Sequence, residues 1–288
     1  MKESFPVNYR LTKNNLEMLD IVNGILDDLQ AQGYTLTLRQ LYYQLVAKGI
    51  IPNRQSEYSK LSTLLVKGRM CGVVDWNAIE DRVRRPQLPY WVFDVEMAID
   101  DTIKSYRLNR QSGQQHYIEV WCEKDALSGI LSRVTSHYHI RLMINRGYSS
   151  ASAMYRAYKR FLMYQEDLKD LVILYLGDHD PSGLDMIRDV DDRLRTFGVL
   201  VDVVHIALTM EQIEKYNPPP NPTKITDPRA EWYLNEYGNT SWEVDALSPQ
   251  ILTELLKKEI NYYVDEDMFN DVIKQEEEDK IELKEFVK

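Results

Sequence analysis

Apolar residues recur at helical spacing through the first 70 residues of the chain. In 14–31 (NNLEMLDIVNGILDDLQA) they repeat every three or four positions and predict a helix. Two more helices are expected at 37–49, with Thr37 as N-cap, and at 56–69. The β-branched stretch at 73–79, VVDWNAI, then predicts a short strand. Three helices followed by a strand are typical of a winged-helix or helix-turn-helix unit, but a small helical bundle would show the same pattern.

The pattern changes after a polar stretch, NRQSGQQ, which reads as a linker near residue 112. Strands are predicted at 116–122, 140–145, 171–177 and 199–208, and helices between them at 126–137, 151–164 and 182–197. Continuous apolar strands that alternate with helices indicate a buried, mainly parallel sheet in an α/β domain. Acidic helices at 248–264 and 267–286 follow. The sequence therefore predicts two domains, 1–111 and 112–288.

The composition places the chain among globular proteins, because 44% of its residues are hydrophobic and 28% are charged. No apolar run approaches the ~20 residues that span a bilayer, and the first ten residues lack the apolar core of a secretory signal. Only Cys71 and Cys122 are present, which argues against a disulfide scaffold. We therefore expect a cytoplasmic protein that does not enter a membrane.

The net charge of −10 is concentrated at one end of the chain. Residues 1–90 hold 12 Lys/Arg and 9 Asp/Glu, whereas residues 231–288 hold 6 Lys/Arg and 16 Asp/Glu. Because the local field matters more than the total charge, a slightly basic front half leaves DNA binding open. The acidic end is equally consistent with a solvated helix.

Three acidic residues follow predicted strands. Glu123 ends the first strand in VWCEKDA, and Asp178 and Asp180 end the third in LYLGDHDPSG. Ligands of open α/β sheets bind at the carboxyl ends of the strands, where three carboxylates suit Mg²⁺. Asp180, followed by Pro181, is alternatively the N-cap of the next helix.

The order of these motifs resembles that of a Toprim domain, the fold of topoisomerases, primases and related nucleases. INRGYSSASAMYR, between the two acidic motifs, resembles the glycine element of that fold. The stretch TLRQLYY (37–43) resembles the catalytic segment of the topoisomerase VI A subunit and of the related meiotic double-strand-break protein. This resemblance implies that Tyr43 is a nucleophile, that Arg39 assists it, and that Tyr42 fills the adjoining aromatic position.

Helical geometry agrees with that assignment. Arg39 and Tyr43 are four residues apart and share one helix face, so that the guanidinium can meet the phosphate that the phenol attacks. A phenol with an ordinary pKa of ~10 needs such help near neutral pH. Tyr42 shares the apolar face of Leu38 and Leu45 and should be structural. In a chain with 19 tyrosines, an ordinary packing role for Tyr43 is the alternative.

The resemblance also implies a magnesium site made of Glu123, Asp178 and Asp180. In WEVDAL, Glu243 and Asp245 lie either near this site or in solvent before a helix. Basic side chains that are predicted to contact DNA phosphates are Lys60, Lys67, Arg69, Arg82, Arg84, Arg85 and Arg146. A solvated basic surface is the alternative for this set.

The family resemblance implies Mg²⁺-dependent cleavage of double-stranded DNA through a 5′-phosphotyrosyl link. It also implies a homodimer in which the tyrosine of one subunit works with the metal site of the other. Nothing in the sequence resembles an ATPase, so strand passage would need an ATPase partner subunit. Two alternatives are a Toprim nuclease that uses water as nucleophile and a non-catalytic DNA-binding subunit.

Overall fold

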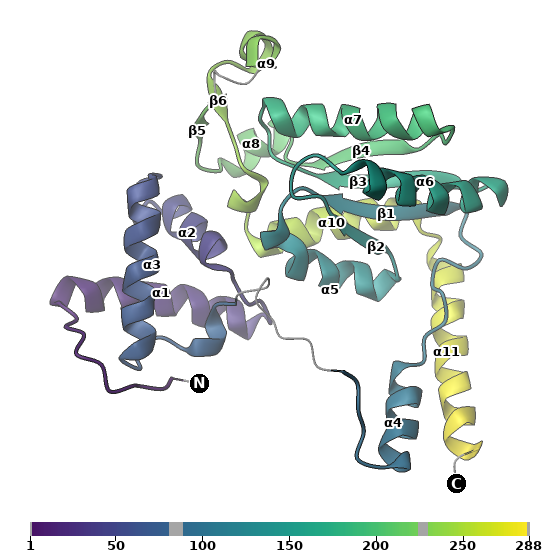
Figure 1. Ribbon diagram of the computed structural model, residues 1–288, viewed down its shortest axis with the longest axis horizontal. Coiled ribbons are helices and arrows are strands. Elements are labelled where there is room, and N and C mark those ends of the chain that lie inside the picture. Colours follow the sequence, from purple (N-terminus) through teal and green to yellow (C-terminus); the bar gives the residue numbers. More distant parts are fainter. Residues whose placement is uncertain (1, 81–88, 224–229, 287–288) are drawn as a thin grey trace.

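A computed structural model describes residues 2–80, 89–223 and 230–286 of the chain. It is an α/β protein, as the sequence predicts, with a four-stranded parallel sheet. The first three helices lie to one side of the sheet and its flanking helices, and the helix pair α4 and α11 extends away from it (Figure 1). No helix in the described ranges is long and apolar enough to cross a membrane.

The three N-terminal helices end within one or two residues of their predicted bounds. They are α1 (Lys13–Ala31), α2 (Leu38–Ala47) and α3 (Gln55–Met70). Thr37 is the N-cap of α2, where its hydroxyl accepts from the Gln40 amide and the Gln40 side chain accepts from the Thr37 amide. Buried Leu19, Leu41 and Leu65 pack the three helices into one core.

The predicted strand after α3 is wrong. Asp75 accepts a hydrogen bond from the Asn77 amide at 2.7 Å, and this cap starts the short 3₁₀ helix η1 (Trp76–Ala78). Within residues 2–80 the only β-type pairings are isolated bridges, one of which joins Leu36 to Ile79. The winged helix therefore stays a prediction. The basic residues Arg82, Arg84 and Arg85 lie outside the described residues.

The sheet has the strand order β2-β1-β3-β4, and every neighbouring pair is parallel. Its strands are β1 (His116–Cys122), β2 (Arg141–Ile144), β3 (Asp170–Leu176) and β4 (Asp202–Ala207). The predicted helices flank it: α5 (Ser128–Tyr138) and α10 (Pro249–Tyr263) on one face, and α6 (Ala151–Glu166) and α7 (Pro181–Phe197) on the other (Figure 1). Cys122 pairs with Leu176, so the residues after β1 and β3 emerge together at one edge.

Short elements lie between the main ones. They are η2 (Asp125–Leu127), α8 (Met210–Tyr216), β5 (Asn221–Pro222), α9 (Ala230–Tyr237), β6 (Thr240–Ser241) and η3 (Val244–Ala246). β5 and β6 pair antiparallel, with Asn221 opposite Ser241. This strand pair brings residues 217–222 (NPPPNP) next to the turn that carries Glu243, two residues beyond β6.

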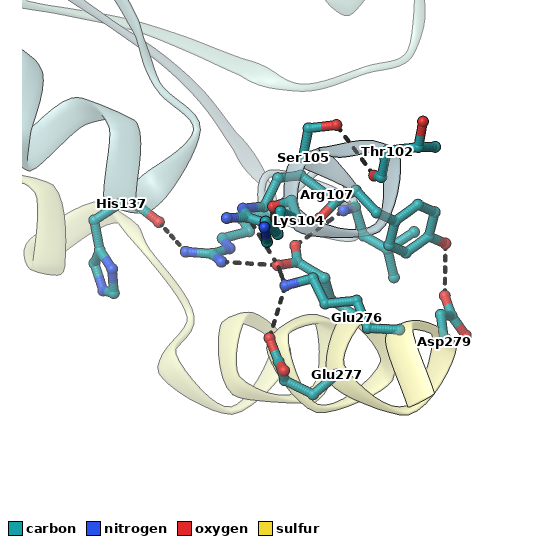
Figure 2. Close-up of polar contacts among 12 residues, drawn as sticks. Thr102, Lys104, Ser105, Arg107, His137, Glu276, Glu277 and Asp279 are labelled. Carbon is teal, nitrogen blue, oxygen red and sulfur yellow. Dashed lines mark hydrogen bonds and ion pairs between the residues drawn. The ribbon is translucent and has the colours of Figure 1, made fainter. Parts of the chain in front are cut away.

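Helices α4 (Val95–Ser105) and α11 (Glu266–Phe286) pack side by side, and a buried carboxylate of α11 binds the segment that follows α4 (Figures 1 and 2). Glu276 of α11 is 1% exposed and accepts hydrogen bonds from the Leu108 amide at 3.0 Å, from Arg110 at 3.2 Å and from Lys280 at 2.9 Å. Helix α4 belongs to the predicted first domain, 1–111, yet it packs against the last helix of the chain.

Candidate active site

Glu123 and Asp178 meet at the carboxyl edge of the sheet. Each follows a strand of the central pair, and the backbone amide of Asp178 donates to Glu123 Oε2 at 3.2 Å. Asp178 Oδ1 accepts from the amide of Val244 at 2.9 Å, which attaches η3 to the same edge. The structure therefore brings together two of the three carboxylates that the sequence assigns to a metal site.

Asp180, the third of these carboxylates, lies at the start of α7. Its Oδ1 accepts from the Gly183 amide at 2.7 Å and caps α7, with Pro181 in the first turn of that helix. A Cβ atom on Gly183 would lie 2.2 Å from the Asp178 carbonyl oxygen, so only glycine allows this close approach. Asp180 is therefore the N-cap of α7, and its role as a metal ligand stays a prediction.

A lysine that the sequence motifs did not single out lies among the carboxylates. Lys124 Nζ is 2.5 Å from Asp178 Oδ2, 3.7 Å from Glu243 Oε2 and 3.9 Å from Glu123 Oε1. Burial, reinforced by Glu123, raises the pKa of Asp178 to about 7 although Lys124 opposes the shift. Burial acts to lower the pKa of Lys124, but the surrounding carboxylates raise it by more. The pKa of Lys124 is therefore above its ordinary value. The carboxylates thus converge on a cationic group.

Arg39 of α2 joins the N-terminal helices to this cluster. Its Nε donates to Asp245 Oδ2 at 2.7 Å, and its guanidinium also forms an ion pair with Glu243. The Asp245 side chain is 0% exposed, whereas that of Arg39 is 42% exposed. Both acidic residues of WEVDAL therefore lie at the sheet edge and not in free solvent. The sequence left these two placements open.

Tyr43 lies beside Arg39, as the helical spacing predicts. The guanidinium carbon of Arg39 is 5.6 Å from the centroid of the Tyr43 ring, and Tyr43 is 4% exposed. Burial raises the pKa of Tyr43 to about 12; the negative charge of Asp245 adds to this shift and Arg39 opposes it. The phenol is therefore protonated at neutral pH in this conformation.

A polar cavity of about 350 Å³ opens at the two tyrosines of α2. It is lined by Arg39, Tyr42, Tyr43, Asn53, Arg54, Gln55, Tyr58, Asn221 and Glu243. The Tyr42 hydroxyl donates to Asn53 Oδ1 at 2.9 Å and accepts from the Arg54 amide at 2.8 Å. Tyr42 therefore has a structural role in holding the turn between α2 and α3, as its position on the apolar face predicts.

The basic residues that are predicted to contact DNA differ in their partners within the structure. Arg69 donates to the carbonyl oxygens of Trp76 at 3.2 Å and Ile79 at 2.6 Å, and so holds the turn after α3; its contact with phosphate stays a prediction. Lys60 pairs with Glu57 at 2.7 Å, and Arg146 pairs with Asp125 at 3.0 Å. The side chains of Lys60 and Arg146 stay 71% and 62% exposed. Lys67 lines a cavity between α1 and α3.

The donor set at the sheet edge has the chemistry that Mg²⁺ prefers. In the described part of the chain, no group of three or more His, Cys, Asp or Glu side chains is arranged as a metal site. However, the ammonium of Lys124 shows that Glu123 and Asp178 already converge on a cation. Both supply hard oxygen atoms, so these two residues could hold a divalent ion.

No protein-family model matches the chain, and no curated protein resembles it significantly.

Proposed function

We propose that this protein cleaves double-stranded DNA by transesterification, with Tyr43 as nucleophile and Mg²⁺ at Glu123 and Asp178, in the manner of a topoisomerase VI A subunit. The observation that supports this most directly is the position of Arg39. It lies against the ring of Tyr43 and donates to Asp245, so it connects the phenol with the carboxylates at the sheet edge. The parallel sheet is compatible with a Toprim-like core, and a winged helix for residues 1–111 is part of the proposal.

The proposed step makes one bond and breaks one. Tyr43 Oη bonds to phosphorus while the bond from phosphorus to the 3′ oxygen breaks, which leaves a 5′-phosphotyrosyl link and a free 3′-hydroxyl. The phenol gives its proton to Glu243 of the acidic cluster that α2 faces in the reactive arrangement, and the 3′ oxygen takes up a proton from water as it leaves. Arg39 opposes the charge of the phosphate. A bound Mg²⁺ would supply Lewis-acid stabilisation of the phosphate and leaving oxygen.

The proposal requires a second arrangement of α2. Tyr43 is 4% exposed, so a phosphodiester reaches it only when α2 separates from η3. Breaking the contacts of Arg39 with Glu243 and Asp245 would free α2 to present Tyr43 to the acidic cluster of a second copy. A homodimer on double-stranded DNA is thus part of the proposal, and an ATPase partner subunit would be needed for strand passage.

The decisive experiment is a search for a covalent protein–DNA adduct. Purified protein is incubated with supercoiled plasmid and Mg²⁺, stopped with detergent, and assayed for nicks and for protein on the 5′ ends. We expect Tyr43→Phe to abolish both products, because it removes only the hydroxyl. Tyr262→Phe, at an exposed tyrosine of α10, is the control that keeps both. Cleavage by Tyr43→Phe at the parent rate would overturn the transesterase proposal.

One observation favours a hydrolytic nuclease as the second candidate. A buried phenol whose pKa is about 12 is a poor nucleophile in the conformation described. A water molecule activated at the Glu123 and Asp178 edge would cleave DNA without Tyr43. The same plasmid assay separates the two functions, since hydrolysis leaves nicks with no protein attached and survives Tyr43→Phe.

A further inference from the structure

Lys124 occupies the position at the sheet edge on which the two proposed metal ligands converge. It follows Glu123 directly, in the turn after β1. Its Nζ is 2.5 Å from Asp178 Oδ2 and 3.9 Å from Glu123 Oε1. The Lys124 side chain is 19% exposed, so the ammonium is largely enclosed by the cluster. The proposed cleavage step gives this enclosed cation no task.

The other oxygen atom of each carboxylate is held by the backbone. Asp178 Oδ1 accepts from the amide of Val244 at 2.9 Å, and Glu123 Oε2 accepts from the amide of Asp178 at 3.2 Å. These bonds leave Asp178 Oδ2 and Glu123 Oε1 for a cation, and Lys124 forms ion pairs with both atoms. None of these contacts involves α2, so they persist when α2 separates from η3.

An ammonium and a divalent ion cannot both bind these two oxygen atoms. Mg²⁺ binds carboxylate oxygen atoms at about 2.0–2.1 Å. Because Lys124 Nζ is 2.5 Å from Asp178 Oδ2, the two cations would share one oxygen atom at close range, where like charges in a partly buried site repel strongly. The lysine side chain has a flexible four-carbon stem, so the ammonium can turn toward the remaining carboxylates without a change in the backbone.

The cations of the chain do not satisfy every carboxylate oxygen of the cluster. In the described part of the chain, Asp245 Oδ1 is buried and has no hydrogen-bond partner, although Oδ2 of the same side chain accepts from Arg39. A buried acceptor without a partner is costly. The cluster is therefore short of positive charge, which favours the entry of an ion with a higher charge than an ammonium.

We propose that Lys124 is a built-in competitor for the divalent ion: its ammonium holds the position between Glu123 and Asp178 until a divalent ion displaces it. This inference rests on the proposed function, which takes those two residues as the ligands of Mg²⁺. Lys124 thereby sets the metal concentration at which the site fills. Until the ion binds, Lys124 also compensates the buried carboxylate of Asp178, which would be strongly destabilising without a partner.

The test is the affinity for Mn²⁺, which suits the same oxygen ligands as Mg²⁺ and is measured in its free form by electron paramagnetic resonance. We expect Lys124→Met to lower the dissociation constant by about 10- to 100-fold, because the metal no longer has to break a charge-assisted contact. Adding Glu123→Gln should remove this gain. Lys280→Met is the matched control and should leave the affinity unchanged, since Lys280 is 14% exposed and pairs with the buried Glu276 of α11 at 2.9 Å.

A second readout is the unfolding temperature in EDTA and in saturating Mg²⁺. In EDTA, Lys124→Met should unfold below the parent, and Mg²⁺ should restore most of the loss. Lys280→Met should lose stability without this recovery. If Lys124→Met does not fold in EDTA, Lys124→Gln, whose amide can still donate to Asp178, replaces it in both measurements.

A further variant separates displacement from a general effect of charge. Arg39→Gln removes a positive charge that pairs with Glu243 and Asp245, and it should change the Mn²⁺ affinity much less than Lys124→Met does. An equal gain in Arg39→Gln, or no gain in a folded Lys124 variant, would overturn the inference. The proposed function fails separately, if the parent forms no adduct with DNA while Lys124→Met still gains the Mn²⁺ affinity that Glu123→Gln removes.

Discussion

The ion pair between Arg39 and Asp245 should be the main polar contact that holds α2 against η3. The perturbation is a double-mutant cycle with Arg39→Gln, Asp245→Asn and the double variant. The pair is joined by a charge-assisted hydrogen bond of 2.7 Å, a class of contact that contributes about 1.5–3 kcal/mol. Asp245 is fully buried, but the Arg39 side chain is 42% exposed and is partly screened by water. We therefore expect a coupling energy of about 1–2 kcal/mol.

The coupling energy is measured from the free energy of unfolding of the four proteins in urea at pH 7. An exposed pair, Lys13 and Glu17 of α1, provides the control: its atoms are 3.9 Å apart and its side chains are 89% and 62% exposed. That cycle should give no coupling beyond experimental error. If the Arg39–Asp245 coupling is equally small, α2 is not held by this contact, and the argument that Arg39 connects Tyr43 to the cluster is refuted.

Two further predictions concern backbone packing and pH. Gly183→Ala should lower the unfolding temperature, because its Cβ would lie 2.2 Å from the Asp178 carbonyl oxygen; Gly24→Ala in α1, whose Cβ meets nothing within 4 Å, should raise it slightly. Burial lowers the pKa of His205 to about 4, so below pH 6.5 the unfolded chain binds a proton that the folded chain does not. Stability should then be lost as the pH falls from 6.5 toward 4, by at most about 1.4 kcal/mol per pH unit, and urea midpoints of His205→Gln should show a shallower fall.

Most of the fold could be predicted because its signals are local. The strands at 116–122 and 171–177 are continuous apolar runs, and the structure places β1 and β3 there almost residue for residue. The prediction of a strand at 73–79 is wrong because β-branched residues do not by themselves make a strand. Asp75 caps a 3₁₀ turn instead, and the described chain offers only Leu36 as a β-bridge partner for this segment. Helix α4 was missed, because only Ile103 of its apolar residues is fully buried and its packing depends on distant α11.

One part of the site could be predicted because it follows from the direction of the strands alone. Glu123 and Asp178 had to meet, since parallel neighbouring strands end at one edge. The Pro181 that follows Asp180 is a signal for a helix start, and the structure shows Asp180 as the N-cap of that helix. Two other contacts involve residues far apart in the sequence, namely Arg39 with Asp245 and Asn53 with Asn221. No periodicity within either segment carries that information.

The charge balance of the cluster indicates the order in which the partners of the proposed reaction could bind. Four carboxylates, those of Glu123, Asp178, Glu243 and Asp245, are arranged around the cationic groups of Lys124 and Arg39. When all of these groups are ionised, their net formal charge is −2, a deficit of two positive charges. The site is partly buried, where unbalanced charge is costly. A DNA phosphate would add to the deficit. A divalent cation supplies the two missing charges, so it should bind before the phosphate or together with it, and not after it.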